Sequence, residues 1–242
     1  MMKRDCTQSQ EDQSLLKRKA AKFAVDFVES GMVLGLGSGS TARFAIELIG
    51  DRLKTGDLKD IIAIPSSVQT EKLATVFRIP LISFDLFSEI DLTIDGADEV
   101  DPQLDLIKGR GGALLREKVI AQVSQRNTII VDETKLSPQL GILQPVPVEV
   151  IPFAQHLEMD YLTSLDAEVT LREKNDGEPF FTDEGNYILD SDFGPIEDPG
   201  KLASLLERRA GIVEHGLFLN LATDVIVAGK DGIRHLKREV SI

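Results

Sequence analysis

Three short segments of the chain carry residue types that together suit proton transfer on a small phosphorylated molecule. The first, LGLGSGSTARFAIEL at 34–48, is a glycine-rich turn between an apolar run and a helical pattern. The second, LTIDGADEVD at 92–101, places aspartates just after another apolar run. The third, IKGRGGALLREK at 107–118, is a second glycine-rich turn flanked by a lysine and a glutamate. These segments supply a phosphate cradle, acid/base groups, a cation and a candidate base.

The glycine-rich turn GLGSGSTA at 35–42 is the candidate anion site. Glycines let the backbone approach a ligand closely, and the N–H groups at the start of a helix attract an anion. Ser38, Ser40 and Thr41 add hydroxyl donors. The alternative is a tight strand–helix turn in which these hydroxyls cap the helix. The turn lacks the glycine and acid pattern of a dinucleotide site, and it has no GK[ST] sequence of a Walker loop.

Asp95 and Asp98 are the candidate acid/base pair. Asp95 ends an apolar strand, at the position where open α/β sheets bind their ligands. The Gly-Ala spacing between the two aspartates favours a turn that directs both carboxylates inward. The alternatives are an acidic surface loop and a site for a hard metal ion.

Lys108 and Glu117 flank the second glycine-rich turn. Glu117 lies in the second turn of the helix that follows, where a carboxylate can face the mouth of the loop. The alternative is a charge pattern on a solvated helix face. The three histidines (156, 215 and 235) have no ligand spacing and no nearby nucleophile motif, so we expect no catalytic histidine.

Composition limits the partners of the chain. It has 242 residues, a formal net charge of −13 and 42% hydrophobic residues. Nucleic-acid binding draws on clustered Lys and Arg, so this charge argues against it. Cys6 is the single cysteine, so neither an internal disulfide nor a zinc site built from cysteines is possible. The sequence lacks an apolar leader and a run of about 18 apolar residues. We therefore expect a cytoplasmic protein without a membrane or nucleic-acid partner.

The first part of the chain alternates predicted helices and strands. This order predicts an α/β fold, with a Rossmann-like, mostly parallel sheet and helices on both faces. We expect helices at 15–28, 41–53, 67–77 and 113–124, and strands at 32–37, 61–64, 80–84, 91–95 and 128–132.

The pattern changes near residue 141. The proline-rich segment at 145–152 predicts a linker that runs into an edge strand. The β-α-β-β-α-β order that follows predicts a smaller α+β domain of the ferredoxin-like type. The apolar strand at 224–229 can return to the first sheet. We therefore expect a Rossmann-like catalytic domain (13–144 and 222–242), a small domain (145–221) and an N-terminal extension (1–12).

Taken in order and spacing, these motifs closely resemble the type A ribose-5-phosphate isomerase family. That family carries a GTGSTA-like loop, then DGADE, then KGGGGALxREK, then VDxxK, which is VDETK at 131–135 in this chain. TDEGNYILD at 182–190 and a late GLF also match. The resemblance extends from about residue 15 to residue 232.

The resemblance implies interconversion of ribose 5-phosphate and ribulose 5-phosphate through an enediolate in the pentose phosphate pathway, without a metal or cofactor, in a homodimer or homotetramer. It implies Glu117 as the general base, with Asp95, Asp98 and Lys108 as further catalytic residues. Asp95 is the candidate for opening the sugar ring, with Asp98 assisting. The implied substrate-binding residues are Lys17, Ser38, Gly39, Ser40, Thr41, Gly96, Ala97, Gly109, Arg110, Gly111 and Lys135.

One position departs from the family pattern, and two alternative functions remain. Arg110 replaces a glycine of the family, and its side chain either contacts the substrate or points to solvent. A related amino-sugar phosphate deaminase would need a catalytic histidine after the acidic motif, and none is present there. A sugar-phosphate-sensing regulator would need a DNA-binding helix-turn-helix, for which the short N-terminal segment leaves no room.

Overall fold

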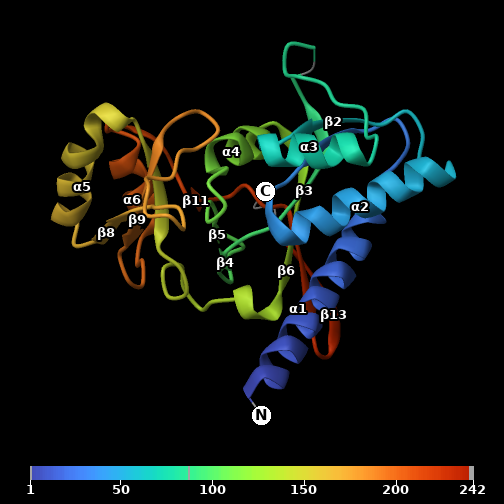
Figure 1. Ribbon diagram of the computed structural model, residues 1–242, viewed down its shortest axis with the longest axis horizontal. Helices are drawn as coiled ribbons and strands as arrows, with labels where there is room; N and C mark the ends of the chain where they lie inside the picture. Colours follow the sequence, from blue (N-terminus) through green and yellow to red (C-terminus); the bar gives the residue numbers. More distant parts are fainter. Residues whose placement is uncertain (1, 87, 240–242) are drawn as a thin grey trace. The chain divides into compact units, whose positions relative to one another are not determined.

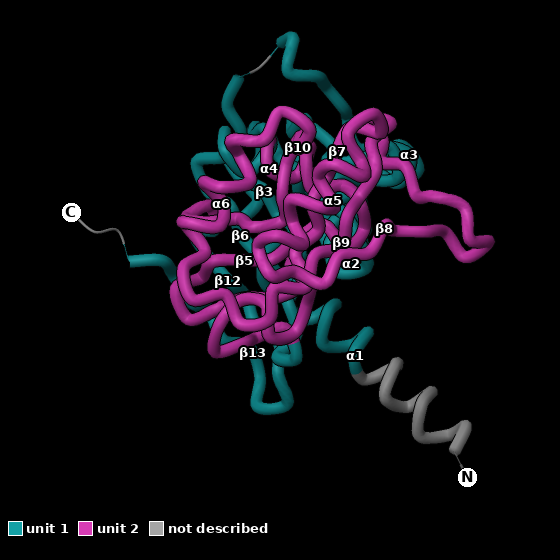
Figure 2. The backbone as a smooth tube through the Cα atoms, turned by 90° about the vertical axis from the view of Figure 1, so that its left-hand side faces the viewer, with its two compact units in different colours: residues 1–96, 120–134, 222–242 teal, residues 97–119, 135–221 magenta. Residues whose placement is uncertain are grey.

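The computed structural model describes residues 2–86 and 88–239, and for residues 2–12 it describes the backbone alone. The chain forms two compact units, each built from separate segments (Figure 2). Unit 1 comprises Met1–Gly96, Ile120–Thr134 and Ala222–Ile242, and unit 2 comprises Ala97–Val119 and Lys135–Leu221. The domain boundaries expected from the sequence stay a prediction. The expectations for Cys6 and for the 1–12 extension lie outside the described side chains.

Unit 1 is built on a six-stranded sheet in the order β13-β12-β6-β3-β1-β2. Figure 1 labels β2, β3, β6 and β13 of this sheet. Every neighbouring pair is parallel except β12 and β13, which form an antiparallel hairpin. This arrangement confirms the expected mostly parallel sheet and the return of the 224–229 strand. The strands are β1 (Val33–Leu36), β2 (Ile62–Pro65), β3 (Ile90–Asp95), β6 (Ser124–Asp132), β12 (Asp224–Gly229) and β13 (Gly232–Lys237).

The helices of unit 1 pack on both faces of this sheet. Successive side chains of each strand point to opposite faces, and both faces are apolar. Leu34 and Leu92 belong to the main core cluster, together with buried residues of the first two helices. Gly35 and Thr93 approach the opposite side, where a Cβ at Gly35 would lie 2.7 Å from Ile120. The helices are α1 (Met2–Val25), α2 (Gly39–Thr55), α3 (Val68–Val76) and the C-terminal end of α4 (Leu114–Gln122).

A buried carboxylate joins the last two strands of unit 1 to β6. The Asp224 side chain accepts hydrogen bonds of 2.9 Å from both Nε and Nη2 of Arg126, and it lies 2.5 Å from Nε2 of His235. Burial raises the pKa of Asp224, but the hydrogen bonds from Arg126, His235 and Thr223 outweigh it and lower the pKa to about 2. The carboxylate therefore stays charged at neutral pH and ties the three strands together.

Unit 2 contains an antiparallel sheet in the order β10-β7-β9-β8 and a three-stranded sheet in the order β11-β5-β4. Along the chain, the larger sheet and its two helices follow a β-α-β-β-α-β order, which confirms the expected ferredoxin-like fold. Its elements are β7 (Val146–Val150), α5 (Gln155–Ser164), β8 (Glu168–Leu171), β9 (Tyr187–Asp192), α6 (Pro199–Leu206) and β10 (Ile212–His215). The smaller sheet is formed by β4 (Glu99–Val100), β5 (Leu106–Ile107) and β11 (Leu217–Phe218).

Two expectations about strands are wrong. The segment 80–84 forms no strand and contributes only a single bridge from Leu81 to Ala63. The proline-rich segment contains β7, which lies inside its sheet and not at the edge, because it pairs with both β9 and β10. Pro147 is tolerated there because pairing with β10 covers only Val148–Val150, so the missing N–H of the proline interrupts no bond to that strand.

None of the helices in the described part of the chain is long and apolar enough to cross a membrane.

Candidate active site

The first glycine-rich loop joins β1 to α2 and lies directly against Asp95. A Cβ at Gly37 would lie 2.1 Å from Oδ1 of Asp95, so only glycine permits this approach. The same carboxylate oxygen accepts hydrogen bonds from the backbone N–H of Ser38 at 3.0 Å and of Gly96 at 2.7 Å. The structure thus brings the expected phosphate loop and the expected ring-opening residue together within unit 1.

The side chain of Ser38 belongs to a buried cluster of hydroxyl groups. Its Oγ lies 2.7 Å from Oγ of Ser66, 3.0 Å from Oγ of Ser67 and 3.2 Å from Oγ1 of Thr70. Thr70 in turn donates to the carbonyl of Gly37 at 3.0 Å. The sequence reasoning missed this cluster, which fixes the loop from the start of α3. Ser38 precedes α2 as its N-cap residue but makes no capping bond with its side chain.

The N-terminal end of α2 carries the other polar groups expected to hold phosphate. Ser40 is exposed, and Nζ of Lys17 donates to its Oγ at 3.1 Å. Lys17 comes from α1, so the structure brings together two residues far apart in the sequence. Both residues line a cavity with Arg43 and Phe44.

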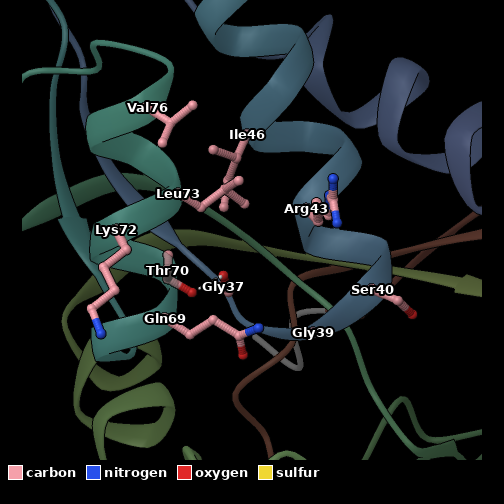
Figure 3. Close-up of a pocket in the computed structure, with 10 residues that line it drawn as sticks. All are labelled: Gly37, Gly39, Ser40, Arg43, Ile46, Gln69, Thr70, Lys72, Leu73 and Val76. Atoms are coloured by element: carbon pink, nitrogen blue, oxygen red, sulfur yellow. Dashed lines mark hydrogen bonds between the residues drawn. The ribbon is translucent and has the colours of Figure 1, made fainter.

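A second cavity, of about 470 Å³, opens between α2 and α3 beside the same loop. Figure 3 shows Ile46 of α2 and Leu73 of α3 pointing toward one another, and Gln69 pointing from α3 toward Gly39. The cavity therefore has an apolar wall and a polar end formed by the glycine loop. Its lining residues are Gly37, Gly39, Ser40, Arg43, Ile46, Gln69, Thr70, Lys72, Leu73 and Val76.

The second group of expected residues lies in unit 2 and centres on an ion pair. Nζ of Lys108 and Oε2 of Glu117 are 3.3 Å apart, and both side chains are buried. Lys108 follows β5, and Glu117 lies in the first turn of α4. The expected placement of Glu117 in the second turn is wrong, because α4 begins only at Leu114. The expected cation and base therefore face one another.

The glycine-rich turn after Lys108 is held by Arg172, which the sequence reasoning missed, and by Asp98, which it named. Nη1 of Arg172 donates to the carbonyls of Gly109 at 2.8 Å and Arg110 at 3.0 Å. Asp98 accepts a 2.9 Å hydrogen bond from the backbone N–H of Arg110, whose side chain is exposed. Gly109 has a φ of +106°, a conformation that L side chains rarely adopt.

Each acidic side chain of the segment 95–101 binds backbone N–H groups. In addition to Asp95 and Asp98, Asp101 accepts a 2.8 Å hydrogen bond from the N–H of Asp105. Glu99 is fully buried and accepts four bonds of 3.1–3.2 Å, from the N–H groups of residues 141 to 144. Among the described residues, no group of three or more His, Cys, Asp or Glu side chains is arranged to hold a metal ion.

The remaining expected residues are placed as follows. Thr41 lies in the first turn of α2, Gly96 and Ala97 follow β3, and Gly111 lies in the second glycine-rich turn. Lys135 ends the short 3₁₀ helix η1 (Glu133–Lys135) and belongs to unit 2. Their contact with a substrate stays a prediction.

Comparisons with known proteins agree with these motifs. The family model described as ribose 5-phosphate isomerase A (phosphoriboisomerase A) matches residues 62–232. The chain is 58% identical to ribose-5-phosphate isomerase A of Desulfatibacillum aliphaticivorans, over 93% of this chain and 98% of that protein. It is 54% identical to the Chloroflexus aurantiacus enzyme of the same name, over 91% and 92% of the two chains.

Solved structures of similar proteins share the fold. Ribose 5-phosphate isomerase from Plasmodium falciparum superposes with a TM-score of 0.91 at 40% identity, covering 94% of this chain and all of the other. A D-ribose-5-phosphate isomerase in complex with phospho-erythronic acid superposes with a TM-score of 0.90 at 43% identity, covering 92% and 98%.

Proposed function

The chain belongs to the ribose 5-phosphate isomerase A family and interconverts ribose 5-phosphate and ribulose 5-phosphate, and we propose a mechanism for this reaction. In this mechanism Glu117 is the general base and the intermediate is an enediolate. The buried Lys108–Glu117 pair carries this proposal. A carboxylate can take a proton from the carbon beside a carbonyl, and an ammonium group beside it can stabilise the oxyanion that forms.

The reaction would begin with opening of the sugar ring, because ribose 5-phosphate is mostly a cyclic hemiacetal. Asp95 would take the proton of the C1 hydroxyl as the bond from C1 to the ring oxygen breaks, and it would then return this proton to the ring oxygen. Asp98 would assist or orient. The two backbone N–H groups that bind Oδ1 of Asp95 fix the direction of its carboxylate.

Proton transfer between C2 and C1 would follow. Glu117 would remove the proton from C2, and the electron pair would move to the C1 carbonyl oxygen, giving an enediolate stabilised by Lys108. The protonated Glu117 would then deliver the proton to C1. At the same time the proton of the C2 hydroxyl would pass to the oxyanion on the C1 oxygen, so that C2 becomes the ketone and C1 carries a hydroxyl. The net change moves hydrogen within the substrate and needs no oxidant or reductant.

The phosphate would bind at the loop of residues 38–41. Lys17 already lies beside Ser40, and the N–H groups at the start of α2 favour an anion. Lys135 would be a further cation. Binding of this remote group would help to position the reacting carbons, so free ribose should be a very poor substrate.

Further parts of the proposal concern metal and assembly. Lys108 can stabilise the oxyanion without a metal ion, so activity should survive prolonged EDTA treatment. Loss of activity that a divalent ion restores would contradict this expectation.

A homodimer or homotetramer, implied by the resemblance, stays a prediction. Phospho-erythronic acid, which is bound in a similar solved isomerase structure, is a useful probe of the site because it combines a phosphate with a carboxylate.

The test is to incubate the purified protein with ribose 5-phosphate and to measure ketose formation. Glu117→Gln keeps the shape of the side chain and removes its basicity, so kcat should fall roughly 10²–10⁴-fold with KM little changed. Glu184→Gln is a matched control, because Glu184 pairs with the neighbouring Arg116 at an exposed position. Near-normal kcat in Glu117→Gln would refute the assignment of the base.

A further inference from the structure

Three consecutive residues at the start of α4 each form an ion pair with a different segment. Successive residues of a helix project about 100° apart, so such pairs can fix the rotation of a helix about its axis. The exposed pair contributes little to stability, since both of its side chains are about 40% exposed. The Lys108–Glu117 pair is buried on both sides, and in the third pair Lys118 is buried whereas Glu214 is partly exposed. The three pairs are Arg116 with Glu184, Glu117 with Lys108, and Lys118 with Glu214.

Lys118 is a buried ammonium group with a built binding site. Its Nζ donates to Oε1 of Glu214 at 2.6 Å and to the carbonyl of His215 at 2.7 Å, and the side chain is only 7% exposed. Burial lowers the pKa of Lys118 below its usual value, and the negative charges of Glu214 and Glu207 oppose this effect only in part. A charge buried in this way persists only with a close counter-ion and good hydrogen bonds, and Glu214 provides both.

The imidazole of His215 adds no competing charge. Burial, reinforced by the neighbouring Lys118, lowers the pKa of His215 to about 3, so the ring is neutral at physiological pH. Its Nδ1 accepts from the backbone N–H of Leu217 at 3.3 Å and lies 3.4 Å from Nζ of Lys118. The ammonium group is therefore neutralised by Glu214 alone among its hydrogen-bonding partners.

The short segment 214–218 also holds Lys108. The backbone N–H of Lys108 donates to the carbonyl of Gly216 at 2.9 Å, and a Cβ at Gly216 would lie 2.3 Å from the Lys108 carbonyl. The fully buried ring of Phe218 lies 5.5 Å from Nζ of Lys108 and 4.9 Å from Nζ of Lys118. One segment of five residues thus contacts both ammonium groups, one of which pairs with Glu117.

We propose that Lys118 is a positioning residue of the isomerisation: it locks α4 to the segment 214–218, so that Glu117 and Lys108 stay aligned for proton transfer. The proposal rests on the function proposed above. Lys118 itself is held by Glu214 and His215 and takes no part in the proton transfer. Its effect is geometric, and a displacement of about 1 Å at a reacting group can cost about 10²-fold in rate.

The test compares three variants of the full chain by steady-state kinetics with ribose 5-phosphate. Lys118→Met keeps most of the side-chain volume and removes the charge, and we expect kcat to fall roughly 10–100-fold with KM within about twofold, since the phosphate loop is untouched. Glu214→Gln keeps an oxygen acceptor and removes the counter-ion, and it should lower kcat by a smaller factor with the same unchanged KM. Arg116→Met removes the exposed pair of the same helix and should leave both constants within about twofold.

The results separate this inference from the proposed function. A wild-type protein without isomerase activity, or a Glu117→Gln variant with normal kcat, would refute the proposed function. An active wild type in which Lys118→Met and Glu214→Gln match Arg116→Met would refute the positioning role alone, as would losses confined to KM. If Lys118→Met does not fold, Glu214→Gln decides, because Glu214 is partly exposed and its replacement leaves a neutral polar side chain.

Discussion

Replacement of Glu99 by glutamine should destabilise the protein more than replacement of any aspartate of the segment 95–101 by asparagine. The carboxylate of Glu99 accepts four backbone N–H bonds from residues 141 to 144 and is fully buried. Each of its two oxygens accepts two of these bonds. In Glu99→Gln one oxygen becomes an NH₂ group, so two N–H donors lose their acceptor and face another donor.

The expected magnitude follows from these contacts. Hydrogen bonds to a charged group contribute about 1.5–3 kcal/mol each, so the loss of two costs roughly 3–6 kcal/mol. The lower end applies here, because Ile142 and Leu143 are 45% and 42% exposed and their backbone can turn toward water. For a chain of this length, a loss of about 3 kcal/mol lowers Tm by roughly 6–12 °C.

Thermal unfolding and hydrogen exchange measure this effect together. The matched control is Glu168→Gln, an exposed glutamate of β8, whose replacement should change stability by less than about 0.5 kcal/mol. In Glu99→Gln the amides of residues 141–144 should exchange faster than in the wild type. A Tm within 2 °C of the control, or a lower Tm without faster exchange at these four amides, would show that the carboxylate does not anchor the loop.

Three further changes test other parts of the structure. Arg110→Gly should leave KM within about twofold and lower stability only slightly, because the exposed side chain is lost while the backbone bond to Asp98 is kept; a tenfold rise in KM would place the guanidinium at the substrate. Asp224→Asn should lower the urea midpoint most above about pH 4, the difference shrinking as pH falls toward 2, because the folded-state pKa of about 2 lies below the unfolded value; a pH-independent difference would contradict this. Gly37→Ala should reduce kcat by roughly 10²-fold, because its methyl group would displace Asp95, and a normal kcat in enzyme assays would exclude that steric role.

The regular elements of the fold could be predicted where local pattern and burial agree. The strands β1 and β3 are short apolar runs followed by polar turn residues, and their positions match the expectation within one or two residues. The segment 80–84 is equally apolar, but it makes only one bridge, and no local signal separates a strand from a segment that merely passes beside one. The sequence did not predict that β7 pairs on both sides, because a proline such as Pro147 usually indicates an edge strand. Pro147 removes a hydrogen bond only if the neighbouring strand extends as far as its N position, and β10 does not.

The sequence predicts the residue types of the candidate site, but it does not predict the contacts that support these residues. Asp95, Lys108 and Glu117 stand in motifs whose spacing is visible in one sequence. The partners of the acidic motif are not visible, because Glu99 binds residues more than forty positions away. Lys118 gives no local signal either, since its partners Glu214 and His215 lie almost a hundred residues later. Such contacts depend on the folded topology, which periodicity does not encode.

The order of strands in unit 1 has a consequence for synthesis of the chain on the ribosome. β6 ends at residue 132, but its neighbour β12 begins only at residue 224, after the whole second part of unit 2. At about 5–20 residues per second, roughly 5–20 s pass before β12 can be made. During that time the N–H and C=O groups along one side of β6 have no strand to pair with, and such an edge invites association with other chains. Until β12 is made, a chaperone that covers the free edge of β6 would therefore prevent association with other chains and favour correct folding.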